Sequence, residues 1–158
     1  MLRRAVEIVF GPDDLRIIWH LPANLPPAWA DETYAEEAFR NLLRNAQKYT
    51  PPQSPIELTA LLDDRCIRVF VIDHGPGIPP EAQDLIFERF YRVGQSGEHA
   101  PRGWGLGLHF ARSLLIAQGG SLRLESPAHP DPDAPGSRFV VELLIAEEVQ
   151  DYGKFAAD

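Results

Sequence analysis

The sequence has only one cysteine, Cys66, among its 158 residues. A single thiol excludes an internal disulfide bond and any metal site built from several cysteines, and it is typical of a reducing compartment. Because Cys66 lies in an apolar stretch, we interpret it as a small core residue.

Long apolar runs and an excess of positive charge are also missing. No stretch approaches the roughly 20 apolar residues of a membrane-spanning helix, and no signal-peptide core follows the first residues. The formal net charge is −8, which argues against nucleic acid as a partner. We therefore expect a cytoplasmic domain without direct membrane contact, even if a longer parent protein is membrane-anchored.

Two common site types are absent as well. The five histidines are scattered and no pair has the spacing of a metal site on a helix, so no histidine metal centre is predicted. We interpret His74 as exposed and non-catalytic. The glycine-rich stretch 103–108 is not a Walker A loop, because no Gly-Lys-Ser/Thr follows it.

Hydrophobic periodicity predicts an α+β fold, a two-layer α/β sandwich. Short turns between neighbouring strands indicate a mixed, mostly antiparallel sheet with the helices on one face. Residues 1–10 fit either a strand or the end of a helix. The predicted strands are 15–21, 56–62, 66–72, 121–125 and 137–146, and the predicted helices are 31–50, 81–90 and 106–118.

The length indicates one domain with flanking segments. We assign residues 15–146 to the folded domain and expect a mobile loop at about 91–105, where little can pack. Residues 1–14 are interpreted as a linker from a preceding domain, and residues 147–158 as a peripheral tail.

The predicted helix that includes residues 41–50 has two contrasting faces. At about 100° per residue, Asn41, Asn45, Lys48 and Tyr49 fall within one sector, and apolar residues fall opposite them. Amide oxygens suit a hard cation and an ammonium suits phosphate. From this helix alone, an ordinary solvated face is an equally good interpretation.

Two glycine motifs follow. Asp73 ends a predicted central strand and is followed by Gly75 and Gly77, so that its carboxylate can accept a hydrogen bond from an exocyclic amine while a flat ring approaches the backbone. The stretch 103–108 precedes a helix, whose free N–H groups favour phosphate. Each motif alone is a weak signal, because turns and helix starts often contain glycine.

Together these features resemble the ATP-binding catalytic domain of sensor histidine kinases, within the GHKL superfamily and its Bergerat fold. Residues 41–50 are similar to the N box, 73–77 to the G1 box, 87–90 to the F box and 103–108 to the G2 box. The four boxes occur in the family's order, and the resemblance covers about residues 15–146.

The resemblance implies ATP and Mg²⁺ as cofactors. It implies that Asn45 is the Mg²⁺ ligand and that Asn41 assists close to the phosphates. It further implies that Lys48 and Arg92 contact the phosphates. Asp73 would accept a hydrogen bond from the adenine amino group. The other implied nucleotide-binding residues are Tyr49, Gly75, Gly77, Ile78, Phe87, Phe90, Gly103, Gly105, Leu106, Gly107 and Leu108, with Phe87 and Phe90 anchoring a mobile lid. Trp104 and Gln118 depart from the usual pattern, which has a small hydroxyl residue and often a histidine there.

The implied role is the catalytic half of a two-component sensor kinase. The γ-phosphate would pass to a histidine in a separate dimerisation domain, with a response regulator downstream, and we expect no autophosphorylation without that domain. ATPases of the superfamily have a glutamate where this chain has Asn41, whose amide cannot act as a base. A related anti-sigma-factor serine kinase, or a nucleotide-sensing module without kinase activity, remains an alternative.

Overall fold

A computed structural model describes residues 1–93 and 104–146 of the chain and confirms the predicted order of elements. The segment 1–10, for which the sequence left a strand or the end of a helix open, contains a helix. The elements are α1 (Leu2–Phe10), β1 (Ile17–His20), α2 (Glu32–Tyr49), β2 (Ile56–Asp63), β3 (Cys66–Asp73), the 3₁₀ turns η1 (Pro80–Ala82) and η2 (Leu85–Phe87), α3 (Gly107–Ile116), β4 (Ser121–Glu125) and β5 (Ser137–Leu144).

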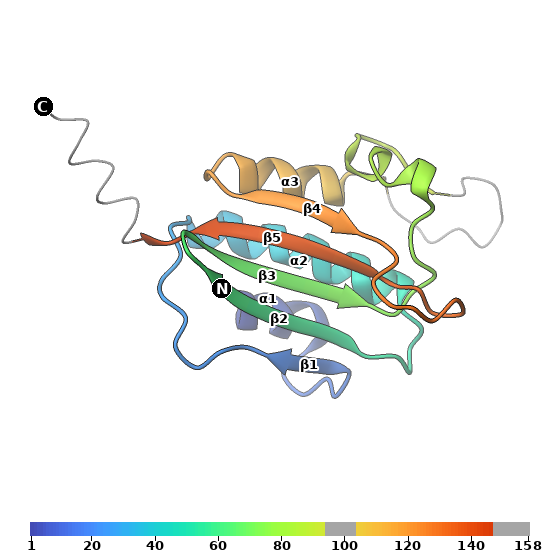
Figure 1. The fold of residues 1–158 in the computed structure, drawn as a ribbon, viewed down its shortest axis with the longest axis horizontal. Helices are drawn as coiled ribbons and strands as arrows, with labels where there is room; N and C mark the ends of the chain where they lie inside the picture. The colour runs from blue at the N-terminus through green and yellow to red at the C-terminus, as the bar shows by residue number, and fades with distance from the viewer. Residues whose placement is uncertain (94–103, 147–158) are drawn as a thin grey trace, which may run out of the picture.

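The described strands form one sheet in the order β1-β2-β3-β5-β4. Only β1 and β2 pair in parallel, so the sheet is mixed and mostly antiparallel as predicted. Figure 1 shows α1, α2 and α3 on the same side of the sheet, which confirms the two-layer sandwich.

The core lies between the sheet and the helices. Alternate strand residues such as Leu58, Val71 and Val141 are fully buried, as are Phe39 and Leu42 of α2. This follows from the period of two in the strands and 3.6 in the helix, which bring the apolar sides of both elements together. The pattern leaves the other side of α2 available for polar groups.

Helix α2 begins and ends where its sequence indicates. The Asp31 carboxylate accepts hydrogen bonds from the backbone N–H groups of Thr33 and Tyr34, at 2.9 and 3.0 Å. Thr50 is extended because Pro51 follows it. Although α2 is 18 residues long, neither it nor any other described helix is both long and apolar enough to cross a membrane.

The predicted helix 81–90 is instead two short 3₁₀ turns. Ile86 and Phe87 are buried in the core, and the chain then reverses so that the N–H of Phe90 bonds to the carbonyl of Gly105 at 3.0 Å. Phe90 has φ 65°, which an α-helix cannot accommodate. This tertiary contact overrides the local helical preference.

Helix α1 extends the packed body beyond the predicted boundary at residue 15. Ala5 and Val6 are buried in the same core, and the Arg4 side chain lies 3.4 Å from the Glu36 carboxylate of α2. Residues 2–10 are therefore an integral part of this layer. The predicted connection to a preceding domain stays a prediction, and the predicted tail 147–158 lies outside the described residues.

Two glycines with positive φ provide a test of the packing. Gly136 has φ 60°, and a Cβ there would lie 2.1 Å from the Asp73 carbonyl oxygen, whose strand is fixed by pairing with β5. Gly119 has φ 76° in the turn that ends α3, but its nearest contact would be the flexible Leu144 side chain at 3.3 Å. Gly119→Ala should lower the free energy of unfolding by about 1 kcal/mol, and Gly136→Ala by about 3 kcal/mol or more. Urea denaturation measures both, and equal losses would contradict this account of Gly136.

Candidate functional site

A cavity of about 660 Å³ opens between α2, the end of β3 and the start of α3. Its size suits a small-molecule ligand. It brings together twelve of the residues that the sequence singled out: Asn41, Asn45, Lys48, Tyr49, Asp73, Gly77, Ile78, Arg92, Gly105, Leu106, Gly107 and Leu108.

Helix α2 contributes its polar face to this cavity because its apolar face is fixed in the core. Leu42 and Leu43 are fully buried, so Asn41 and Asn45 are turned to the opposite side. The Asn41 amide nitrogen donates to the Glu37 carbonyl at 2.9 Å, which leaves its oxygen for the cavity. This face of α2 therefore lines a cavity, and its role in binding stays a prediction.

The start of α3 lies directly opposite Asn41. A Cβ on Gly107 would come 3.2 Å from the Asn41 side-chain oxygen, so a larger residue would crowd the two helices. The helix has no side-chain cap at Leu106 and no acidic residue in its first turn. Its first N–H groups are therefore available to an anion, and the helix dipole favours one.

Asp73 is a buried carboxylate at the floor of the cavity. It is 4% exposed, and its Oδ1 accepts hydrogen bonds from the backbone N–H groups of Gly75 at 2.8 Å and Ser137 at 3.2 Å. Burial raises the pKa of Asp73 above its usual value, and these two bonds only partly oppose that effect. Because both bonds end on Oδ1, Oδ2 is the oxygen left for a ligand.

Gly75 and Gly77 are required for different reasons. A Cβ on Gly75 would lie 2.9 Å from the Tyr49 carbonyl oxygen, so this glycine allows the loop to pass the end of α2. Gly75 does not line the cavity. Gly77 does, and its φ of 71° favours glycine.

The two phenylalanines of the 87–90 motif lie outside the cavity lining. Phe87 is buried in the core beneath the Arg112 guanidinium, 4.9 Å from the ring centroid. Phe90 is 62% exposed, and its backbone N–H donates a hydrogen bond to the Gly105 carbonyl. Gly103 and most of the predicted loop 91–105 fall outside the described residues.

The cavity also contains residues that sequence reasoning did not select. Arg44 falls beside Lys48 on the same helical wheel, so the helix pattern alone could have identified it. Nothing local in the sequence indicated that Ser137 contacts Asp73, because the two residues meet only through the pairing of β3 with β5. The others are Pro76, Ile86, Tyr91, Val93, Trp104 and Phe110.

Comparison with known proteins agrees with this geometry. Residues 30–147 match the family of histidine kinase-, DNA gyrase B- and HSP90-like ATPases. The chain belongs to this family. Together with the relatives below, the match confirms the predicted ATP-binding catalytic domain of the histidine kinase type.

Curated relatives are sensor kinases. The chain is 45% identical over 107 residues to the sensor histidine kinase Hik2 of Thermosynechococcus vestitus, covering 68% of this chain and 28% of the relative. It is 38% identical over 127 residues to the histidine-protein kinase/phosphatase MprB of Mycolicibacterium paratuberculosis, covering 78% and 24%. The chain thus spans less than a third of each relative.

Solved structures give the same fold. The mycobacterial sensor histidine kinase MprB matches with a TM-score of 0.74 and 29% identity, over 90% of this chain and 91% of that one. Full-length ShkA in complex with AMPPNP matches with a TM-score of 0.73 and 29% identity, over 92% of this chain and 30% of that one.

Replacing Asp73 by Asn should separate ligand binding from stability. The amide oxygen can keep the bonds to Gly75 and Ser137, which turns the amide NH₂ toward the cavity, where an amine donor finds no acceptor. Affinity for ATP should fall at least about tenfold, as expected for one unmatched hydrogen bond.

Stability should change in the opposite direction. Because the folded-state pKa of Asp73 is raised above its ordinary value of 3.8, the wild type loses stability as pH rises from about 3.8 to the folded-state pKa, and the loss is complete above that pKa. Asp73→Asn should therefore gain in unfolding free energy relative to wild type between about pH 3 and pH 7. Calorimetry and urea denaturation measure the two effects, and a variant that loses stability at pH 7 would contradict the assigned burial cost.

Proposed function

We propose that this domain binds Mg²⁺–ATP and supplies its γ-phosphate to a histidine of a separate dimerisation domain. The observation that carries the proposal is the meeting, in one cavity, of the Asn45 and Lys48 face of α2, the buried Asp73 carboxylate and the uncapped start of α3. The face of α2 suits the metal ion, the Asp73 carboxylate suits the adenine base, and the start of α3 suits the phosphates.

The adenine end lies at Asp73. Its free oxygen accepts a hydrogen bond from the exocyclic amine, and the half-exposed Tyr49 ring and Ile78 form apolar walls for the base. A buried acceptor discriminates strongly, because a base without the amine leaves the carboxylate unpaired.

The phosphate end lies between the two helices. The Lys48 ammonium rests over the Tyr49 ring, 4.9 Å from its centroid, and is one of three cationic side chains at the cavity, with Arg44 and Arg92. Together with the first N–H groups of α3 they position the triphosphate and stabilise the charge of the transferring phosphoryl group.

The donor set suits Mg²⁺. Asn45 offers a neutral amide oxygen and Asn41 a second one a turn away, and Mg²⁺ is commonly held by few protein oxygens together with substrate phosphates and water. When bound, Mg²⁺ neutralises charge on the phosphate oxygens.

The described lining of the cavity offers no base suited to activating water. Among its described lining residues, Asp73 is the one acidic side chain, and it serves the adenine. Glu37 lies one turn before Asn41 and is paired with Arg40 at 2.9 Å. The general base that activates the attacking group must then come with the phosphate acceptor. This favours a kinase domain over a water-activating ATPase. The acceptor domain and a downstream response regulator are the proposed partners.

Calorimetry and phosphotransfer together test this function. The chain should bind Mg²⁺–ATP, hydrolyse it negligibly alone, and form acid-labile phosphohistidine on a supplied dimerisation domain of the parent protein. Asn45→Ala should weaken Mg²⁺-dependent binding and phosphotransfer at least about tenfold, because it removes a ligand of the metal. Gln47→Ala is the matched control, since Gln47 is an exposed residue of the same helix outside the cavity.

Each failure has a distinct meaning. Absent ATP binding, or unchanged binding in Asn45→Ala, would overturn the assigned site. Rapid hydrolysis by the chain alone would indicate the ATPase branch of the family. Acid-stable phosphoserine on an added protein would indicate the serine kinase alternative, and ATP binding without any transfer would indicate a nucleotide-sensing module.

A further inference from the structure

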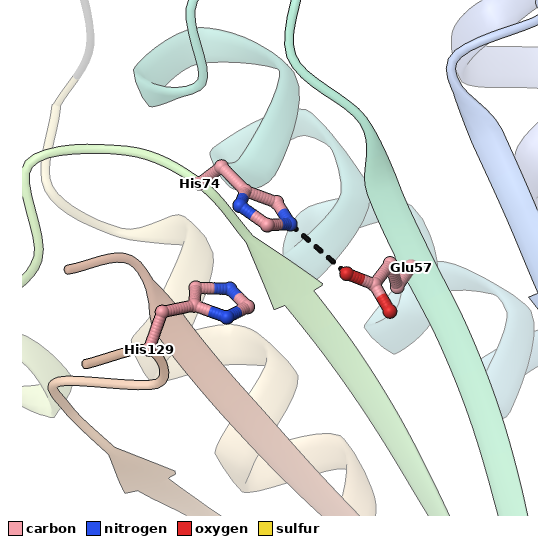
Figure 2. A group of neighbouring side chains, drawn as sticks. All are labelled: Glu57, His74 and His129. Carbon is pink, nitrogen blue, oxygen red and sulfur yellow. Dashed lines mark hydrogen bonds and ion pairs between the residues drawn. The ribbon is translucent and has the colours of Figure 1, made fainter. Parts of the chain in front are cut away.

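A second cluster of polar side chains lies beside the nucleotide cavity and is not part of its lining. Glu57 of β2, His74 directly after β3, and His129 in the loop between β4 and β5 converge, as Figure 2 shows. One potential metal-binding atom from each lies within 4.8 Å of the other two. His74 is 23% exposed, which corrects the interpretation of this residue as exposed.

The contacts within this cluster leave one donor unused. His74 Nε2 and a Glu57 oxygen form a hydrogen bond of 2.9 Å, and the two imidazoles stack with centroids 4.0 Å apart and planes inclined by 16°. His129 Nε2 is buried and has no hydrogen-bond partner among the described residues. A buried polar atom without a partner costs stability unless something binds it.

We propose that Glu57, His74 and His129 form a binding site for one Zn²⁺ ion. Two imidazole nitrogens and one carboxylate oxygen are a donor set that Zn²⁺ accepts, with water completing a tetrahedron. Imidazole favours transition metals over Mg²⁺ and Ca²⁺, which take oxygen ligands. The ion satisfies the unpartnered nitrogen of His129.

The donors need a small rearrangement to bind one ion. Donors of a tetrahedral zinc site lie about 3.4 Å apart, given bonds of about 2.0–2.1 Å. A metal lies in the plane of the imidazole that binds it, so one ring must turn out of the stack. His74 is held by its hydrogen bond to Glu57, whereas His129 Nε2 has no partner among the described residues, which makes His129 the ring that turns.

His20 lies next to the proposed zinc site but is not one of its ligands. Its Nε2 lies 3.8 Å from the other Glu57 oxygen, and its side chain is 55% exposed. It is not a member of the group whose donors approach within 4.8 Å. His20 therefore serves as a control in the same neighbourhood.

The proposed zinc site connects the segment that contains Asp73 with the loop that precedes β5. His74 follows Asp73 directly, and His129 lies in the loop that ends at Gly136, whose N–H donates to the Gly75 carbonyl at 3.0 Å. An ion bound by His74 and His129 cross-links these segments in the folded chain only, so it should raise the unfolding temperature.

Calorimetric titration of the full chain with Zn²⁺ alone, without nucleotide, tests the site. One ion should bind per chain, and Mg²⁺ should give no signal at the same concentrations. His129→Gln and His74→Gln should each weaken Zn²⁺ binding at least tenfold, and His20→Gln should leave it within twofold of wild type. Wild-type affinity in His129→Gln, or an equal loss in His20→Gln, would overturn the proposal.

A second measurement needs no variant. In the wild-type chain, the ring ¹⁵N resonances of His74 and His129 should shift on addition of Zn²⁺, while those of His20 should not. Unshifted His74 and His129 resonances at saturating Zn²⁺ would overturn the site. Because no nucleotide is present, failure here and failure of ATP binding are separate results.

Discussion

The geometry of the site depends on two hydrogen bonds that end on one buried side-chain oxygen. Asp73 ends the central strand β3, and its Oδ1 holds the turn at Gly75 and the start of β5 at Ser137 through two backbone N–H groups. These bonds compensate only partly for burying the charge, which is why the pKa of Asp73 remains raised. The protein accepts this cost at the position where a ligand amine can complete the hydrogen bonding of the carboxylate.

Helix α2 links this site to the stability of the whole domain. Its apolar face, with Phe39 and Leu42, packs on the sheet, and its polar face, with Asn45 and Lys48, lines the cavity. Because both faces belong to one rigid helix, core packing determines where the amides point. Changes in that core would therefore move the proposed metal and phosphate contacts as well as lower stability.

The overall acidity of the chain is compatible with the proposed anionic ligand. The net charge is −8, yet Arg44, Lys48 and Arg92 gather at the cavity together with the N-terminus of α3. Local charges act strongly over a few ångströms, whereas the field of distant carboxylates is screened within about 8–10 Å. An acidic domain can therefore hold a triphosphate while repelling nucleic acid in general.

The sequence by itself determined the element order, the layered fold and most of the cavity lining, because periodicity, caps and glycine motifs are local properties. It correctly indicated the polar face of α2. Tertiary structure alone decided the 3₁₀ turns before Phe90, the role of Ser137 and the approach of His129 to His74. The contacts behind these features join residues 15 to 64 positions apart in the chain, and only the pairing of the strands and the packing of their loops bring such residues together.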